Sequence, residues 1–131
     1  MEGAPMTFGP VQSPDMPVAI GPYSHAVRAG DFVFISGQPG IDPATGSVPE
    51  GGFDAEARQA FINLRTVVSA AGASMGRVVR TTVFLANADD FPAMNQLFAE
   101  FFASAPPARA TPIVSLPRGL RISIDATVFL G

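Results

Sequence analysis

Residues 120–130 of this 131-residue chain read LRISIDATVFL, and they alternate between apolar and mostly polar side chains. Successive side chains of a β-strand point to opposite faces of a sheet, so this stretch predicts one long strand. The apolar face would carry Leu120, Ile122, Ile124, Ala126 and Val128. The opposite face would carry Arg121, Ser123, Asp125, Thr127 and Phe129. The strand therefore predicts a sheet that buries one face against other elements.

Two stretches upstream have the spacing of helices. Apolar residues recur every three or four positions between Asp54 and Gly72, which are the expected N-cap and C-cap. Asp89 and Asp90 would cap a second helix, and the pair Pro106–Pro107 would end it. The buried stripe of this second helix is largely aromatic and comprises Phe91, Met94, Phe98, Phe101 and Phe102.

Shorter segments favour further strands at 23–28, 32–35, 78–85 and, as an edge strand, 111–116. Residues 32–35 are continuously apolar, which is typical of a strand buried on both faces, and residues 36–40 should break it. The predicted order is β-β-α-β-α-β-β, an α+β sheet with its helices packed on one face. The other face needs a cover, and subunit association is the simplest one.

The composition excludes several kinds of chemistry. The chain has no cysteine and no lysine, which excludes thiol nucleophiles, thiolate metal sites and a pyridoxal Schiff base. His25 is the only histidine, so one subunit cannot form a multi-histidine metal site. The net charge of −3 lacks the basic character of most nucleic-acid-binding proteins. We therefore expect no pyridoxal cofactor, no thiolate or multi-histidine metal site and no nucleic-acid partner.

The first residues differ from the rest of the chain. Residues 1–16 are predicted to be a flexible, proline-rich tail, and residues 17–131 a single domain. The start lacks the basic-then-apolar order of a signal peptide, and no apolar run approaches the ~20 residues that span a membrane. We expect a cytoplasmic protein with no membrane partner. With 47% hydrophobic and 15% charged residues, some apolar surface should be covered by other subunits.

Two short motifs are candidates for binding a ligand. Arg109 follows two prolines and an alanine, so it would stand on a stiff approach to a strand. A guanidinium held in this way can bind a carboxylate through two parallel hydrogen bonds, although an ordinary surface arginine is the commoner explanation of such a motif. Ser36 and Gly37 end a predicted strand, where a glycine lets a ligand approach the backbone and where a plain turn glycine is the simpler explanation.

Other polar residues are open to two interpretations each. Tyr23 and His25 lie in one short motif, and a lone histidine is more often a hydrogen-bonded residue than a catalyst. Asn95 lies inside the second helix and could face solvent or a loop. Ser123 and Asp125 share one face of the last strand, where they could orient a water molecule or simply be solvated.

Several short motifs follow one another in a specific order. They are Gly21-Pro22-Tyr23-Ser24, Ser36-Gly37-Gln38, Asn63-Leu64, Ala71-Gly72, Thr82-Val83-Phe84-Leu85, Met94-Asn95, Pro107-Ala108-Arg109 and Leu116-Pro117. Each is weak alone, but the ordered set resembles the RidA family (YjgF/YER057c/UK114) from about Pro17 to Val128.

This resemblance implies a fold, an assembly and an activity. The family's fold is chorismate-mutase-like, a mixed β-sheet with two helices on one face, assembled as a homotrimeric barrel with clefts between subunits. Its archetypal members are 2-iminobutanoate/2-iminopropanoate deaminases. They hydrolyse reactive imines and enamines that pyridoxal enzymes release, giving 2-oxo acids and ammonia. The implied partner is thus a small imine that carries a carboxylate.

The resemblance also implies roles for single residues. Arg109 would anchor the substrate carboxylate, and Tyr23, Ser36 and Gly37 would line the cleft. Asn95 would support the cleft from the second helix.

The resemblance also bears on Thr111 and Ser123, of which Ser123 departs from the archetype. Thr111 stands where the family often has a cysteine or another small residue, and its backbone would contact the imine. Ser123 stands where the archetype has a glutamate thought to orient the attacking water, and Asp125 is the nearest carboxylate. Water activation by Ser123 or Asp125 stays open, and so does a non-catalytic member that binds small carboxylates. RNA cleavage, which has also been attached to the family, is disfavoured by the net charge.

Overall fold

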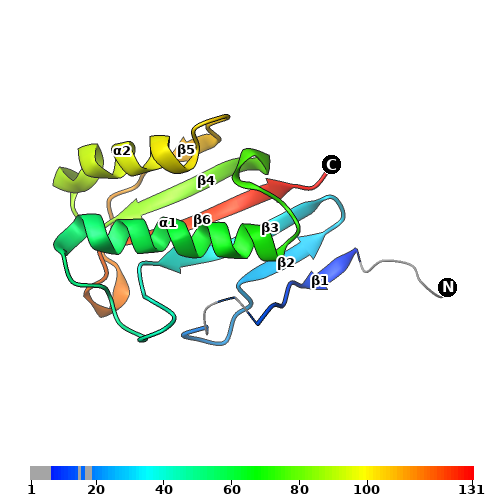
Figure 1. Cartoon of the computed structure of the whole chain (residues 1–131), viewed down its shortest axis with the longest axis horizontal. Coiled ribbons are helices and arrows are strands. Elements are labelled where there is room, and N and C mark those ends of the chain that lie inside the picture. Colours follow the sequence, from blue (N-terminus) through cyan, green and yellow to red (C-terminus); the bar gives the residue numbers. More distant parts are fainter. Residues whose placement is uncertain (1–6, 15, 17–18) are drawn as a thin grey trace.

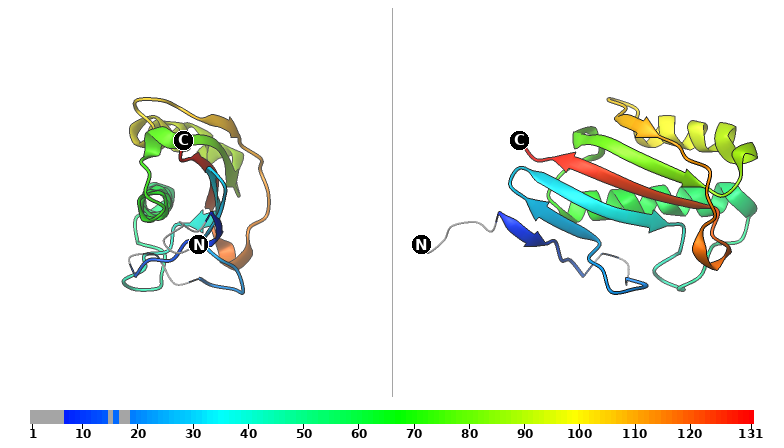
Figure 2. Two further views of the ribbon diagram at one scale, coloured as in Figure 1. Left: turned by 90° about the vertical axis from the view of Figure 1, so that its right-hand side faces the viewer. Right: turned by 180° about the vertical axis from the view of Figure 1, so that it is seen from behind.

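The computed structural model describes residues 7–14, 16 and 19–131. They form a six-stranded sheet in the order β1-β2-β3-β6-β4-β5, with two helices beside it (Figure 1). The turned views show both helices on one side of the sheet, whereas its other side carries no helix (Figure 2). The predicted α+β architecture, with both helices on one face, is confirmed.

The six strands are β1 (Phe8–Pro10), β2 (Ala26–Ala29), β3 (Phe32–Pro39), β4 (Val78–Leu85), β5 (Ala108–Ala110) and β6 (Ile122–Phe129). β4 and β5 run parallel, and the other neighbouring pairs run antiparallel. β4 has the predicted bounds. β6 shows the predicted alternation, because its apolar set is buried and the intervening side chains are not.

The two helices are α1 (Gly52–Ala70) and α2 (Phe91–Phe101), and three single turns of 3₁₀-helix are η1 (Met75–Arg77), η2 (Ala88–Asp90) and η3 (Pro117–Gly119). Asp54 is not the N-cap of α1 as predicted. The helix begins earlier because Gly51 and Gly52 have positive φ angles of 121° and 76°, which glycine tolerates. Asp90 is the N-cap residue of α2, as predicted, but it makes no capping hydrogen bond through its side chain. The Asn87 side chain accepts the backbone N–H of Asp89 instead, at 2.9 Å.

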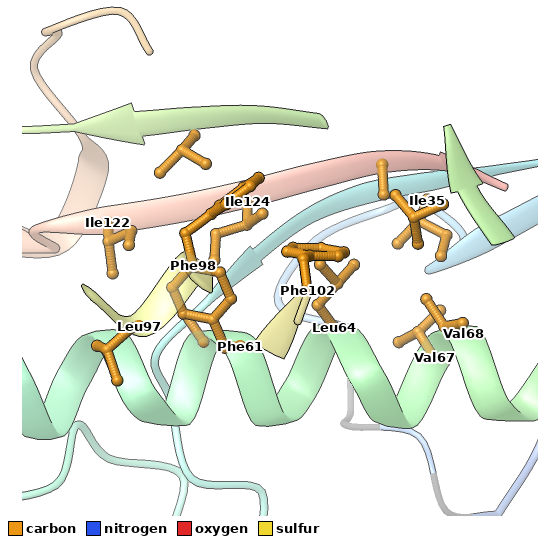
Figure 3. Packing of buried hydrophobic residues seen from close by; sticks show 14 of the residues in the cluster. Ile35, Phe61, Leu64, Val67, Val68, Leu97, Phe98, Phe102, Ile122 and Ile124 are labelled. Atoms are coloured by element: carbon orange, nitrogen blue, oxygen red, sulfur yellow. The ribbon is translucent and has the colours of Figure 1, made fainter. Parts of the chain in front are cut away.

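The core lies between the helices and the sheet. Phe61 and Leu64 of α1 are fully buried, and Figure 3 shows them with side chains of α2 and of the central strands. The rings of Phe61 and Phe98 meet edge to face, with centroids 6.2 Å apart. Fully burying one such side chain stabilises the fold by about 1.5–3 kcal/mol. Because Phe61 lies on α1 and Phe98 on α2, their contact also joins the two helices.

The run 32–35 is not buried on both faces, contrary to the prediction. Val33 and Ile35 are buried, but Phe32 and Phe34 are 40% and 50% exposed because they point to the face that no helix covers. The break predicted at 36–40 is also wrong. β3 continues to Pro39, with a shift of register between Ile35 and Gln38 in its pairing with β6.

Two other expectations about strands and ends need correction. The strand predicted at 111–116 is reduced to an isolated bridge between Ile113 and Leu85 of β4, and β5 precedes it as a short strand parallel to β4. Within the expected tail, residues 8–10 form β1, because the free edge of β2 offers backbone partners. Residues 1–6 and 15 of that tail lie outside the described residues. The predicted boundary at residue 17 also lies there and stays a prediction.

An exposed ion pair joins the two helices. Arg58 Nη1 of α1 lies 2.6 Å from Glu100 Oε2 of α2. This hydrogen bond lowers the pKa of Glu100 and raises the pKa of Arg58. Since the folded-state pKa of Glu100 is lowered, its small contribution to stability is present above the ordinary carboxyl range. That contribution is lost as the pH falls through the folded-state pKa.

The side chain of Asn63 on α1 forms hydrogen bonds with the end of β3 and with the segment that follows it. Its Nδ2 donates to the carbonyl oxygens of Pro39 and Ile41 at 2.9 and 2.8 Å, and the residue is buried. We expect Asn63→Leu to lower the free energy of unfolding by about 2 kcal/mol, because two carbonyls lose their donor. Urea denaturation measures this. Thr66→Val, which removes a bond within the same helix, is the control and should change little. Equal effects of the two substitutions would contradict this role.

Candidate functional site

A pocket of about 290 Å³ lies where β3 and β6 meet the segment that joins β5 to β6. That segment crosses the end of the sheet on its helix-free side (Figure 2). The pocket is lined by Ile20, Tyr23, Ser36, Gly37, Pro39, Leu116, Pro117, Leu120 and Ser123. Of the predicted site residues, the structure thus brings Tyr23, Ser36, Gly37 and Ser123 together.

The register shift in β3 places Gly37 directly against Ser123 of β6. A Cβ atom at Gly37 would lie 2.5 Å from the Ser123 hydroxyl oxygen and 3.8 Å from its Cβ. The first distance is a clash and the second is an ordinary contact. The absence of a side chain at Gly37 therefore leaves room for the Ser123 hydroxyl at the pocket wall.

This geometry predicts a coupling between two substitutions. We expect Gly37→Ala to destabilise the protein by about 1–2 kcal/mol, because the new methyl group clashes with the hydroxyl. In a Ser123→Ala background the clash is gone, so the same change should cost much less. A double-mutant cycle in urea measures the difference. Additive effects would show that the two residues are not in contact as described.

The hydroxyl hydrogen of Ser36 is already used in a hydrogen bond within the chain. Its Oγ donates to the carbonyl oxygen of Ser24 at 2.7 Å, so only its lone pairs remain for a ligand. Its backbone N–H donates to the carbonyl of His25 at 2.9 Å. The hydroxyl group of Ser123 has no hydrogen-bond partner among the residues that the structure describes, so it can both donate and accept.

Arg109 lies at one edge of the sheet, on β5, whereas the serine pocket lies at the central strands β3 and β6. Its guanidinium carbon is 4.7 Å from the ring centroid of Phe98 and 5.5 Å from that of Phe91, and Nη1 is 3.7 Å from Met94 Sδ. Within the described part of the chain, no carboxylate forms an ion pair with this half-buried cation. The aromatic rings hold the guanidinium in place, and its N–H donors have no anionic partner among the described residues.

Asn95 and Thr111 belong to the same edge as Arg109. Asn95 is half-buried on α2, and Thr111 follows β5 directly. β6 and β4 separate β5 from β3, which is roughly 14 Å of sheet at the usual strand spacing. The candidate residues thus form two groups in one chain, Arg109 with Asn95 and Thr111 at one edge, and the serine pocket elsewhere.

Asp125, the carboxylate candidate nearest to Ser123 in the sequence, does not reach the pocket. Asp125 Oδ1 accepts the backbone N–H of Thr82 at 2.7 Å, across the β6–β4 pairing, and Asp125 does not line the pocket. Asp89 lies in the turn η2. Across the described ranges, His, Cys, Asp and Glu side chains form no cluster of three that could hold a metal ion. Over the same ranges, every helix is too short or too polar to cross a membrane.

Sequence reasoning missed the apolar wall of the pocket. Leu116 and Leu120 come from an irregular segment, and their place in the same pocket as Ser36 depends on the path of that segment across the sheet. The alternating pattern of 120–130 placed Leu120 on an apolar face, but no periodic pattern marks Leu116. Leu116-Pro117 was visible as a motif, but its place beside Ser36 was not.

The chain resembles known proteins over nearly its whole length. A family model described as Endoribonuclease L-PSP matches residues 13–130. A mouse protein named 2-iminobutanoate/2-iminopropanoate deaminase is 44% identical over 116 residues, which cover 88% of this chain and 86% of the mouse protein. A protein of that name from Dermatophagoides farinae is 42% identical over 121 residues, covering 92% and 94% of the two chains.

Solved structures agree with these sequences. The crystal structure of RidA from a Psychrobacter species matches with a TM-score of 0.87 and 38% identity, covering 92% of this chain and 98% of that one. The crystal structure of E. coli TdcF with bound serine also matches with a TM-score of 0.87, at 33% identity, and covers 92% and 98% of the two chains.

Proposed function

The chain belongs to the RidA family, and we propose that it hydrolyses 2-imino acids and related enamines to 2-oxo acids and ammonia. The observation that carries this proposal is Arg109, a cation held between aromatic rings without an acidic partner among the described residues. Such a group suits a carboxylate ligand, because a planar guanidinium binds a carboxylate with two parallel hydrogen bonds. The names of the relatives supply the reaction class.

The proposed active unit is a homotrimer with its sites between subunits. Two features of one chain support this. The edge strand β5 carries Arg109 far from the serine pocket, so a second copy is needed to complete a site. The helix-free face of the sheet carries the exposed and mutually packed rings of Phe32, Phe34 and Phe129, and an apolar patch of this kind indicates an interaction surface.

In the proposed complex, Arg109 of one subunit binds the substrate carboxylate at the mouth of the neighbour's serine pocket. Asn95 and the backbone of Thr111 lie on the side of Arg109, and Tyr23 lies on the side of the pocket. Binding of serine to the related TdcF supports a ligand with a carboxylate in this family. Holding the substrate by its carboxylate orients the imine carbon and lowers the entropic cost of the reaction.

The reaction then needs one water molecule. Water adds to the imine carbon, a proton passes to nitrogen, and the C–N bond breaks to leave a 2-oxo acid and ammonia. In this proposal the Ser123 hydroxyl orients that water, which is supported by its position in the pocket wall and by its lack of a hydrogen-bond partner among the described residues. Asp125 is a weaker candidate, since it is bound to Thr82. The lone pairs of Ser36 can accept a hydrogen from the imine nitrogen. A protonated imine is already electrophilic, so this chemistry needs no metal or organic cofactor.

A coupled assay tests the proposal. An amino-acid oxidase generates imines from several amino acids, and their loss is followed with and without the purified protein. We expect hydrolysis to be faster than the spontaneous reaction, and an unchanged rate with every imine would refute the proposed function. Calorimetric binding of 2-oxo acids without any turnover would instead indicate the non-catalytic alternative, which a serine in place of the archetype's glutamate favours.

A further inference from the structure

A second cavity, of about 200 Å³, lies beside the serine pocket and is mainly apolar. Its walls include Ile41 and Pro43 from the loop after β3, and it shares Tyr23 with the serine pocket. Two buried polar side chains, His25 and Gln38, also line it. His25 is 8% exposed and Gln38 is fully buried. None of the roles proposed above uses this pair.

The hydrogen bonds around Gln38 determine where the proton of His25 lies. The Gln38 amide group faces the carbonyl oxygen of Ser36 at 3.0 Å, and a carbonyl can only accept. The group at that position is therefore the amide nitrogen. The same nitrogen lies 3.1 Å from His25 Nδ1 and donates its second hydrogen there. Because Nδ1 accepts, a neutral His25 carries its proton on Nε2.

This arrangement leaves one donor and one acceptor without partners. His25 Nε2 and Gln38 Oε1 are both buried and have no hydrogen-bond partner in the described part of the chain. An unpaired buried polar atom destabilises a protein, and such atoms call for an explanation. Because both residues line the cavity, a ligand there that accepts one hydrogen bond and donates another would supply the two missing partners.

We propose that this cavity binds a small neutral molecule with an apolar body and a primary amide or hydroxyl group. The apolar walls suit the body, His25 Nε2–H donates to the oxygen, and Gln38 Oε1 accepts from the N–H or O–H. Arg118 also lines the cavity, with a left-handed backbone (φ 60°, ψ 22°) that is uncommon for residues other than glycine. A carboxylate would attract Arg118 but would repel the oxygen of Gln38, so a neutral group fits the pair better.

Direct binding tests this proposal independently of deaminase activity. His25 is the only histidine, so its ring nitrogens are identified without ambiguity in an ¹⁵N NMR spectrum. We expect a protonated Nε2 and an unprotonated Nδ1 in the neutral ring. Titration with isobutyramide should shift the Nε2 resonance to saturation. Isobutyrate and 3-methyl-2-butanone have a similar shape but lack the donor, and should bind at least tenfold more weakly.

Two variants test whether the ligand binds in the cavity, and neither of them replaces His25 or Gln38. Ile41→Trp fills the cavity while leaving His25 and Gln38 themselves unsubstituted, and it should abolish the saturable shift. Val48→Trp, an exposed residue that does not line the cavity, should leave it unchanged. The proposal is overturned if the proton of neutral His25 lies on Nδ1 or if isobutyramide produces no saturable shift. Equal binding of the three probes, or saturation that survives Ile41→Trp, would overturn it too.

Discussion

Replacing Arg109 by alanine is expected to reduce kcat/KM for imine hydrolysis by about 100-fold or more. The side chain offers the substrate a fixed pair of charge-assisted hydrogen bonds, and losing them costs on the order of 3 kcal/mol of transition-state binding. Arg109→Lys keeps the charge but not the planar fork, so its activity should lie between those of the wild type and Arg109→Ala. The coupled imine assay, run at several substrate concentrations, measures both variants.

Arg65→Ala is the matched control for this experiment. Arg65 also places its guanidinium over a phenylalanine of α2, 5.1 Å from the centroid of Phe101, but it lies outside the serine pocket and away from β5. Circular dichroism and light scattering should show that both alanine variants fold and assemble like the wild type. Full activity in a folded Arg109→Ala protein would refute the role of Arg109. Equal losses in both variants would assign the effect to lost packing on α2.

Gly40→Ala is expected to lower the free energy of unfolding by about 3 kcal/mol or more. Gly40 is buried where the chain leaves β3 and passes α1. A Cβ atom there would overlap the backbone carbonyl of Glu56, so the helix or the strand end must move. The Glu56 side chain accepts the backbone N–H of Arg121 at 2.6 Å, so a shift of α1 would also disturb the approach to β6. Urea denaturation measures the change.

Gly76→Ala is the control, because its Cβ would meet only the Ser104 hydroxyl, at an ordinary 3.7 Å. It should change stability by less than about 1 kcal/mol, since alanine also restricts the unfolded chain. Similar stability of the two variants would contradict the close approach of Gly40 to α1. The comparison separates a steric effect at one glycine from the general effect of adding a methyl group.

Periodic segments were predictable because their patterns reflect a single physical cause. The alternation in 120–130 and the helical spacing after Asp54 record which side of each element is buried, and both elements formed as expected. Residues 32–35 misled this reasoning, since an apolar run does not say whether its second face is buried within one chain. Gly51 and Asn87 were missed as caps because backbone angles and local hydrogen bonds, rather than hydropathy, determine where a helix starts.

For the site, residue types alone excluded thiol, lysine and multi-histidine chemistry within one chain and picked out Arg109 and Ser36-Gly37 as candidates. The order of short motifs pointed to the family, which the comparisons confirmed. Only the tertiary structure could place Ser123 in the pocket and Asp125 on Thr82, put Arg109 at a distant edge, and bury His25 against Gln38. Those facts depend on strand order, register and the path of loops. They are contacts between residues far apart in the sequence, and local patterns carry no record of them.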